Sequence, residues 1–468
     1  AAARSGRPPR TPERAPAMSD SPGAAALADP PPYPAPPPLA DAAATDALRG
    51  PGASDDAPRL RRRLRRLRRR MAPGQALELG PAPLSSAAVA RLREAGFAVS
   101  APDGRPPAVH ALAAPPGALA VAGWGTPPGV RLDLRYASDE AALLDPSPMA
   151  VWERVIRGEE RAGARVVEEY AVDDPYGGER AAPALSRFFE VPLEPGQVTF
   201  GAGVSALLHA LAALADGGLV LAPELVHPDL EAWALRGGSE VRLVPGPAAG
   251  LAARVAAEHP ALVHLDRPDF VGATPSLAEV EALARAAARV GAVVVVDESP
   301  APYLGPHASA ARLAGRCDNL VVLRGFTKAY SWGGLRAGFA VASRGVALEV
   351  RELVPPLQVG PLALRAALAL LAAGDVFARL RQVTAVMKPL AAGTLEAAGL
   401  ALLPGPPELP WLGVRDPGGA ASRWLEGRGV FALRPALAPV FPPPDPQVLR
   451  LTVPLSEERM ERFRGLLA

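Results

Sequence analysis

The run Val293-Val294-Val295-Val296-Asp297-Glu298 places two carboxylates directly after four valines. A continuous apolar run without polar alternation is typical of a strand that is buried on both faces of a helix-covered parallel sheet. In open sheets of this kind, ligands bind outside the carboxyl ends of the strands. We therefore expect an α/β fold in which Asp297 lies at a ligand site.

Similar apolar runs alternate with helical patterns on both sides of this stretch. Ser276-Leu277-Ala278-Glu279 is a capping box, which predicts a helix over 277–289. The expected strands and helices of the large domain are 197–200, 204–215, 219–221, 262–265, 277–289, 293–296, 320–323 and 339–341. Long helices after 345, a strand at 448–453 and a helix at 456–467 indicate a smaller domain. The predicted fold class is thus α/β, a mostly parallel sheet with helices on both faces, plus a smaller α+β domain.

Lysine is scarce in this chain, because only Lys328 and Lys388 accompany 48 arginines. Arginine stays protonated and cannot form an imine, whereas a lysine amine can condense with an aldehyde. Lys328 lies in Gly325-Phe326-Thr327-Lys328-Ala329-Tyr330-Ser331-Trp332-Gly333-Gly334, thirty-one residues after Asp297. An imine-forming amine and a carboxylate for a pyridinium nitrogen are what pyridoxal 5'-phosphate requires. We predict this cofactor, with Lys328 as the catalytic amine, and we expect Lys388 to be an ordinary surface residue.

A phosphate group also needs donors, and three features offer them. Gly201-Ala202-Gly203 forms a strand–turn–helix junction whose small residues let backbone N–H groups approach an oxyanion. Arg336, eight residues after Lys328, can bind a phosphate with two hydrogen bonds, and Thr327 offers a hydroxyl beside the lysine. We expect no metal ion in this site.

In combination, these motifs resemble the fold type I pyridoxal-phosphate enzymes, in the class I/II aminotransferase branch that includes histidinol-phosphate aminotransferase. The resemblance covers 131–468 and rests on Asp297-Glu298, the lysine about thirty residues later, Gly201-Ala202, Gly-Leu-Arg-x-Gly at 334–338 and Leu449-Arg450-Leu451-Thr452. It implies that Lys328 forms the Schiff base and moves the Cα proton. It also implies that Asp297 pairs with the ring nitrogen, Arg336 with the phosphate, and Arg450 with the substrate α-carboxylate.

The resemblance further implies a homodimer with a shared active site, in which a tyrosine of the partner subunit reaches the phosphate. Tyr170, in Glu169-Tyr170-Ala171-Val172-Asp173, is the candidate, and Tyr176 is the alternative. Glu169 stands where the family has an arginine, which argues against a phosphorylated substrate. Amino acids and 2-oxo acids are the implied substrates.

Several positions depart from the family pattern. The tyrosine expected three residues after Asp297 is Pro300, and the nearest tyrosine is Tyr303. The asparagine that meets the cofactor's phenolic oxygen is replaced by Asp269, or by Phe270 if the match shifts by one residue. A carboxylate there disfavours the phenolate through like-charge repulsion. His227 is the only π system near the position of the ring-stacking aromatic.

The leading functional hypothesis is an aminotransferase that interconverts an amino acid and its 2-oxo acid. The altered phenolic-oxygen partners and the histidine favour an alternative, a lyase, decarboxylase or cyclase acting at the same Cα. A third hypothesis is a non-catalytic protein that retains the cofactor fold. The presence of Lys328, Asp297 and Arg336 argues against it.

Composition limits the remaining possibilities. The net charge of +2 does not favour nucleic acid or a membrane as partner of the whole chain, and a single cysteine, Cys317, fits a reducing compartment, so we expect a cytoplasmic protein. Only the Arg-rich segment 59–70, a basic amphipathic pattern, is suited to an anionic partner. The predicted organisation is a Pro/Ala-rich and Arg-rich disordered tail (1–70), an extension of unknown role (71–130), a contribution to the small domain and dimer arm (131–165), the large domain (166–344) and the small domain (345–468).

Overall fold

The computed structural model of the chain describes residues 129–136, 139–161, 166, 168–244, 250–435 and 447–468. Before them it describes only Leu92 and four short strands, which form a sheet in the order β1-β2-β4-β3: β1 (Leu39–Ala40), β2 (Ala76–Glu78), β3 (Phe97–Ser100) and β4 (Ala108–Ala111). The rest of the predicted disordered tail, with the Arg-rich segment, lies outside the described residues.

A seven-stranded sheet in the order β6-β12-β11-β10-β9-β7-β8 forms the centre of the large domain. Its strands are β6 (Val198–Gly201), β7 (Leu219–Pro223), β8 (Glu240–Val244), β9 (Leu262–Asp266), β10 (Val293–Asp297), β11 (Leu320–Gly325) and β12 (Gly338–Ala342). β12 runs antiparallel to both of its neighbours, and the other pairings are parallel. The predicted α/β class with a mostly parallel sheet is confirmed.

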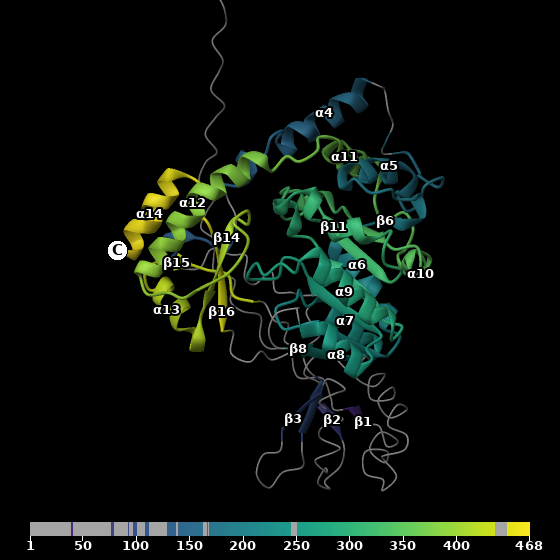
Figure 1. Ribbon diagram of the computed structural model, residues 1–468, viewed down its shortest axis with the longest axis horizontal. Helices are drawn as coiled ribbons and strands as arrows, with labels where there is room; N and C mark the ends of the chain where they lie inside the picture. The colour runs from purple at the N-terminus through teal and green to yellow at the C-terminus, as the bar shows by residue number, and fades with distance from the viewer. Residues whose placement is uncertain are drawn as a thin grey trace, which may run out of the picture.

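Helices cover both faces of this sheet (Figure 1). They are α5 (Gly178–Phe189), α6 (Val204–Leu211), α7 (Asp229–Gly237), α8 (Leu251–Glu258), α9 (Leu277–Ala288) and α10 (Ala347–Leu353). Because side chains alternate along a strand, Val294 and Val296 pack on the face of α8 and α9, whereas Val295 packs on the face of α6 and α7. This double burial is why the run of valines carries no polar alternation.

Sequence patterns located the other strands of this sheet and the helices α6 and α9, whereas α5, α7, α8 and one strand were not predicted. The strand β8 was not predicted, because its alternating exposed and partly buried residues, Glu240-Val241-Arg242-Leu243-Val244, lack a continuous apolar run at the edge of the sheet. The helix expected over 204–215 ends at Leu211 and continues as a 3-10 turn, Ala212–Ala215. The capping box is present: Ser276 Oγ accepts from the backbone N–H of Glu279, whose carboxylate accepts from that of Ser276.

The small domain lies beside the large one and is formed by the two ends of the described chain (Figure 1). Its strands are β5 (Leu132–Asp133), β13 (Leu402–Leu403), β14 (Trp411–Arg415), β15 (Val430–Phe431) and β16 (Val448–Thr452), and its helices are α12 (Ala378–Ala397), α13 (Ala420–Glu426) and α14 (Glu457–Leu467). β5 pairs with β15, while β13, β14 and β16 form an antiparallel sheet.

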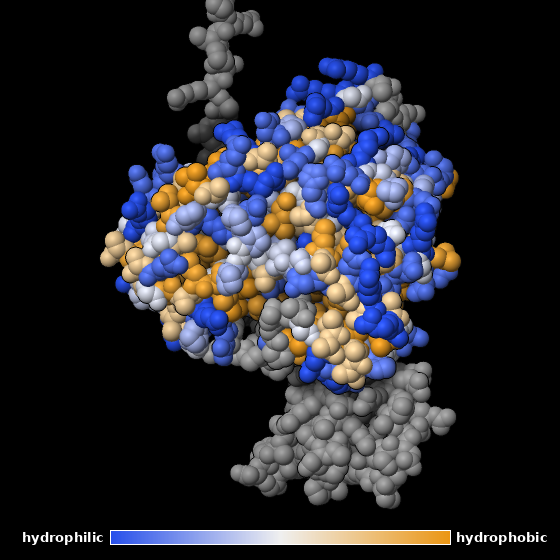
Figure 2. Space-filling view, viewed as in Figure 1, coloured by the Kyte–Doolittle hydropathy of each residue, from blue (hydrophilic) through white to orange (hydrophobic). Residues whose placement is uncertain are grey.

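Two further helices, α4 (Pro148–Arg161) and α11 (Pro361–Ala372), pack against each other, and α11 also packs against α5 of the large domain. Although α10 and α11 follow residue 345, they therefore lie on the large domain. Hydrophilic residues gather along the upper edge of the molecule, over α4 (Figure 2). None of the helices in the described part of the chain is both long and apolar enough to span a membrane.

A buried carboxylate joins the ends of three neighbouring strands. Glu298, which follows β10, accepts hydrogen bonds from Arg267 Nη1 (2.8 Å), at the end of β9, and from Arg324 Nη1 (3.3 Å), on β11. Ser309 Oγ and the backbone N–H of Ala310 also donate to it. All three charged side chains are at least 96% buried, so each needs a buried partner of opposite charge.

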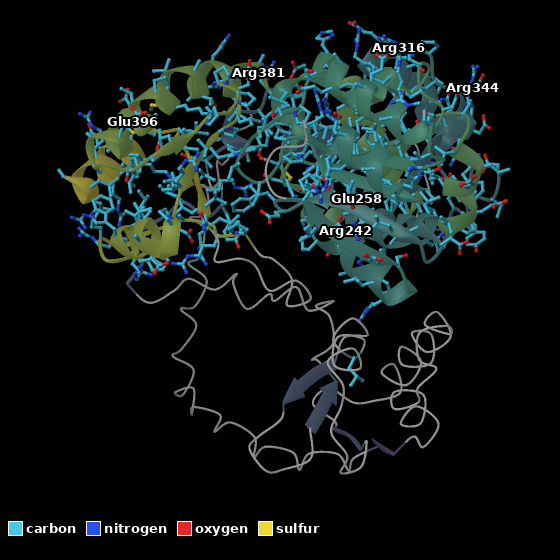
Figure 3. The ribbon with its side chains drawn as sticks, turned by 60° about the horizontal axis from the view of Figure 1, so that its bottom comes forward. Arg242, Glu258, Arg316, Arg344, Arg381 and Glu396 are labelled. Carbon is cyan, nitrogen blue, oxygen red and sulfur yellow. The ribbon has the colours of Figure 1, made fainter. Side chains whose placement is uncertain are left out.

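We predict that Glu298→Gln lowers the free energy of unfolding by about 3–5 kcal/mol, since removing one partner of a buried ion pair leaves the other charge uncompensated. Urea denaturation followed by circular dichroism measures the change. The control is Arg344→Gln, which breaks a peripheral pair with Glu194 whose side chains are 71% and 60% exposed (Figure 3), and should cost less than about 1 kcal/mol. Equal effects of the two substitutions would contradict this prediction.

Candidate functional site

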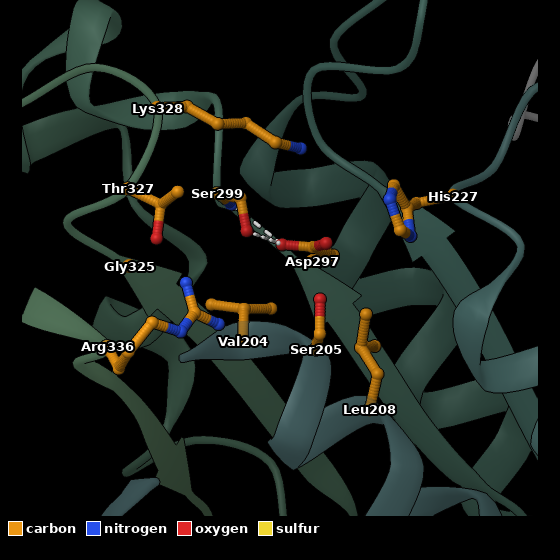
Figure 4. A pocket seen from close by; sticks show the side chains of 10 residues that line it. All are labelled: Val204, Ser205, Leu208, His227, Asp297, Ser299, Gly325, Thr327, Lys328 and Arg336. Atoms are coloured by element: carbon orange, nitrogen blue, oxygen red, sulfur yellow. Dashed lines mark hydrogen bonds between the residues drawn. The ribbon is translucent and has the colours of Figure 1, made fainter. Parts of the chain in front are cut away.

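A pocket opens at the carboxyl ends of β10 and β11, beside the start of α6 (Figure 4). The predicted residues Lys328, Asp297, Thr327, Arg336 and His227 all line it. The other lining residues are Val204, Ser205, Leu208, Ser299 and Gly325. The structure therefore brings an amine, a carboxylate, a guanidinium, three hydroxyls and an imidazole into one cavity.

Asp297 is the last residue of β10 and is 98% buried. Its Oδ1 atom accepts hydrogen bonds from the backbone N–H of Ser299 (2.7 Å) and from Ser299 Oγ (2.5 Å). These two donors fix the carboxylate at the strand end, and its second oxygen lies on the side of His227 (Figure 4). The geometry suits a cation held against that oxygen.

Lys328 follows β11 by three residues, in a turn that leads to β12. Its side chain extends across the pocket toward the side of His227, above Asp297 (Figure 4). The turn is held in place by the backbone N–H of Trp332, which donates to Phe326 O (3.0 Å), and by the edge-on contact of the Trp332 ring with Trp152 of α4. The amine is thus presented from a packed turn between two strands of the sheet.

The opposite end of the pocket is suited to an anion. α6 begins at Val204, so the backbone N–H groups of its first turn have no partner within the helix. Arg336 Nη2 donates to Ala202 O (3.2 Å), which holds the guanidinium beside this helix start. Gly203 has a φ of +85°, and a Cβ atom on it would lie 2.6 Å from Arg336 Nη2. A side chain there would therefore displace the arginine, which explains the glycine.

The rest of the predicted phosphate loop lies directly behind this helix start. Gly201 ends β6, and the backbone N–H of Ala202 donates to Gln358 Oε1 (3.1 Å). Neither residue lines the pocket itself, whereas Ser205 does, and its hydroxyl points toward Asp297 (Figure 4). The sequence analysis did not select Ser205 or Ser299, because a serine in a turn or a first helical turn has many structural roles.

His227 is the only aromatic side chain among the lining residues. Its backbone N–H donates to Asp266 Oδ2 (2.9 Å), and its Nδ1 atom is buried without a hydrogen-bond partner. Burial and the nearby Lys328 amine lower the pKa of His227, so the ring is neutral at physiological pH. A neutral ring on the pocket wall is compatible with contact to a flat cofactor.

Two predicted cofactor contacts lie elsewhere. Asp269 Oδ1 accepts the backbone N–H groups of Val271, Gly272 and Ala273, so this carboxylate caps the turn after β9. Tyr303 OH donates to Glu140 Oε2, and its ring packs against Phe377 and Trp411. Neither residue lines the pocket. The resemblance placed both by counting residues from a motif, and here local hydrogen bonds turn the side chains away.

Arg450, on β16, is partly buried, with its Nε atom out of contact with solvent, and it does not line the pocket. Its guanidinium lies over the rings of Phe270 (5.2 Å) and Trp411 (5.3 Å), and its Nε atom has no hydrogen-bond partner. Burial lowers the pKa of Arg450. Burial also raises the pKa of the neighbouring Glu140 to about 7. A partly buried guanidinium with an unused donor suits a carboxylate ligand.

The two tyrosines considered for a shared site differ in exposure. The side chain of Tyr170 is 74% exposed, and Val172 beside it is 67% exposed. Tyr176 lies against the guanidinium of Arg351 (5.1 Å) within the same chain.

Lys388 is not the surface residue that its sequence pattern indicated. It is buried in α12, and its Nζ atom donates to Pro406 O (2.6 Å) and Leu409 O (3.0 Å). Burial lowers its pKa to about 8. The amphipathic pattern failed here because a long side chain can bury its methylene groups while its amine reaches backbone carbonyls of a neighbouring loop.

Comparison with known proteins supports these observations. The sequence model of the family "Aminotransferase class I and II" matches residues 171–464, more than half of the chain. Histidinol-phosphate aminotransferase of Rhodospirillum centenum is 29% identical over 356 residues, which cover 73% of this chain and 92% of that protein. Aromatic amino acid aminotransferase of Cutibacterium acnes is 34% identical over 156 residues, 33% of this chain and 44% of that protein.

A solved structure has the same fold. The crystal structure of histidinol-phosphate aminotransferase from Sinorhizobium meliloti in complex with pyridoxal-5'-phosphate aligns with a TM-score of 0.58 and 21% identity, covering 72% of this chain and 90% of that one. The match of the family model over more than half of the chain, together with this fold, shows that the protein belongs to the class I and II aminotransferases, which are pyridoxal-phosphate-dependent transferases.

Proposed function

We propose that the pocket binds pyridoxal 5'-phosphate and that this chain transfers the amino group of an amino acid to a 2-oxo acid there. The observation that carries the proposal is the meeting of Lys328 and Asp297 in one cavity with Arg336 and the start of α6. These groups match the aldehyde, the pyridine nitrogen and the phosphate of the cofactor, respectively. The Asp297 carboxylate is therefore negative where the protonated ring nitrogen would be positive, and the Arg336 guanidinium is positive where the phosphate would be negative.

When bound, pyridoxal phosphate supplies an aldehyde that condenses with amines and a protonated ring that accepts electron density from the substrate Cα. Lys328 would hold the cofactor and carry the proton to and from the Cα atom. The Asp297 carboxylate, fixed by Ser299, would keep the ring nitrogen protonated. Arg336 and the first turn of α6 would bind the phosphate, with the Thr327 hydroxyl as a further donor. His227 would lie against the ring.

Arg450 is the proposed partner of the substrate α-carboxylate, which supports amino acids rather than simple amines as substrates. Phe270 and Trp411 beside it would place apolar surface next to that group. Glu169 pairs with Arg365 and Arg180 of its own chain. A carboxylate here, in place of the arginine of the family pattern, disfavours a phosphorylated substrate.

We predict that Lys328→Ala abolishes transamination, by at least ~10²-fold, which is the lower end of what a positioned acid–base group contributes. The assay follows the cofactor absorbance of the wild type and the variant on addition of an amino acid, and detects the 2-oxo acid formed. Borohydride treatment of the loaded wild type should add the mass of the reduced cofactor at Lys328. A lyase would instead release other products while the initial absorbance returns, and absence of the mass gain at Lys328 would sink the proposal.

For the substrate site, Arg450→Gln should raise KM for the amino acid by about 10- to 100-fold with a smaller effect on kcat, since a hydrogen bond to a charged group contributes about 1.5–3 kcal/mol. Steady-state kinetics of the half-reaction measures both constants. Arg415→Gln, at an exposed position of the adjacent strand β14, is the matched control and should change neither. An unchanged KM in a folded Arg450→Gln variant would remove Arg450 from the substrate site.

We also propose a homodimer in which Tyr170 completes the phosphate site of the partner subunit. Its support is the exposure of Tyr170 and Val172, two large side chains of one segment. Co-refolding Tyr170→Ala with Lys328→Ala should produce mixed dimers in which one site has both residues, so activity exceeds that of either variant alone. A monomer in sedimentation, or no gain on mixing, would contradict a shared site.

A further inference from the structure

Four buried polar atoms without hydrogen-bond partners belong to residues that contact one another in a row: Glu231 contacts His264, His264 faces Asp266, and Asp266 accepts from the backbone N–H of His227, which lines the pocket. The four atoms are Glu231 Oε2, His264 Nε2, Asp266 Oδ1 and His227 Nδ1. Glu231 lies on α7, and His264 and Asp266 lie on β9. Side chains alternate along β9, so His264, Asp266 and the buried Leu262 share one face of the sheet, the face that α6 and α7 cover.

The centre of this row is an imidazole between two carboxylates. His264 Nδ1 lies 2.7 Å from Glu231 Oε1, and both side chains are fully buried. On the other side, His264 Nε2 faces Asp266 Oδ1 at 3.8 Å. A neutral imidazole has one N–H group and can donate to only one of the two, whereas an imidazolium donates to both.

The row ends at the residue that faces the cofactor. Asp266 and Asp297 are register partners on the adjacent parallel strands β9 and β10, so their carboxylates lie side by side. Two buried like charges repel each other unless a cation offsets one of them. Burial and the Asp297 carboxylate raise the pKa of Asp266, and His264 acts in the opposite direction.

We infer that Glu231, His264 and Asp266 form a chain of alternating charges, the charge relay. Glu231 holds His264 as an imidazolium, and this imidazolium neutralises Asp266. Asp297 therefore keeps its own negative charge for the ring nitrogen. His264 and Glu231 are positioning residues, since they act on the cofactor only through Asp266 and Asp297. The inference rests on the proposed function in its last step, whereas the charge state of His264 does not depend on it.

The charge state can be measured without cofactor. The chain has six histidines, so ¹⁵N-histidine labelling gives a spectrum simple enough to assign by His264→Gln. Although burial opposes the charge, Glu231, then Asp266 and Asp297 raise the pKa of His264 to about 9. His227, and Lys328 near Asp266, are the other titratable groups that face the cluster. The His264 signals should therefore remain those of an imidazolium at pH 8, and should titrate at lower pH in Glu231→Gln.

The sign of the stability effect follows from the same shift. Because the pKa of His264 in the folded protein lies above its unfolded value, protonation of His264 stabilises the fold. This contribution is fully present below about pH 6.5 and is lost as the pH rises through about 9. Thermal denaturation of the apo protein should therefore show a loss of stability between these values that is smaller in His264→Gln. His209→Gln, a half-buried histidine that stacks on Trp233 of α7, is the matched control and should leave this loss unchanged.

Cofactor titration then tests the link to Asp297. At pH 8 both Glu231→Gln and His264→Gln should weaken pyridoxal-phosphate binding by on the order of tenfold, and the double variant by no more than either alone, because the residues act as one network. At pH 6 the affinity of Glu231→Gln should recover, since His264 can take up a proton there, whereas that of His264→Gln should not.

Each of these experiments has an outcome that contradicts one part of the inference. A wild-type His264 that is neutral at pH 8 would overturn the relay, even if no variant folds. An imidazolium with unchanged cofactor affinity in both variants would overturn its connection to Asp297. Failure of the borohydride experiment at Lys328, with an imidazolium at His264, would count against the proposed function and leave the charge state of the cluster established.

Discussion

The pairing of parallel strands β10 and β11 is the constraint on which the site depends. Both strands end at the same edge of the sheet, so the residue that ends β10 and the turn that follows β11 must lie next to each other. Asp297 occupies the first position and Lys328 the second. The chain between Asp297 and Lys328 returns over one face of the sheet, and the pairing of β10 with β11 makes the two residues neighbours in space.

Holding charged groups at this edge has a cost in desolvation, which the structure offsets with buried counter-charges. Glu298 neutralises Arg267 and Arg324 behind the pocket, and Ser299 donates twice to Asp297 at its floor. These partners come from the strands themselves or from the turns directly after them. The same elements that build the core therefore orient the site, so a change in the register of β10 would alter both.

The sequence predicted the parts of the molecule that rest on local pattern. Runs of apolar residues located the central strands, and the scarcity of lysine singled out Lys328, which does line the pocket. Prediction was poorest where position depends on tertiary contacts: Asp269 caps a turn, Tyr303 bonds to Glu140 from a distant segment, and Lys388 reaches carbonyls of another loop. A motif gives the order of residues, but the direction of a side chain follows from partners that the motif does not contain.

His264 illustrates the signal that sequence reasoning passed over. A histidine inside the strand Leu262–Asp266, between apolar neighbours, is costly to bury unless a partner of opposite charge reaches it. Its partner, Glu231, lies thirty-three residues away on a helix whose pattern gives no sign of a buried carboxylate. Each residue alone is unremarkable in the sequence. Both side chains are fully buried, and the other side of the His264 ring faces the carboxylate of Asp266 at 3.8 Å. Because an apolar pair of similar volume would serve stability as well, the pair is better explained by a demand from the neighbouring pocket.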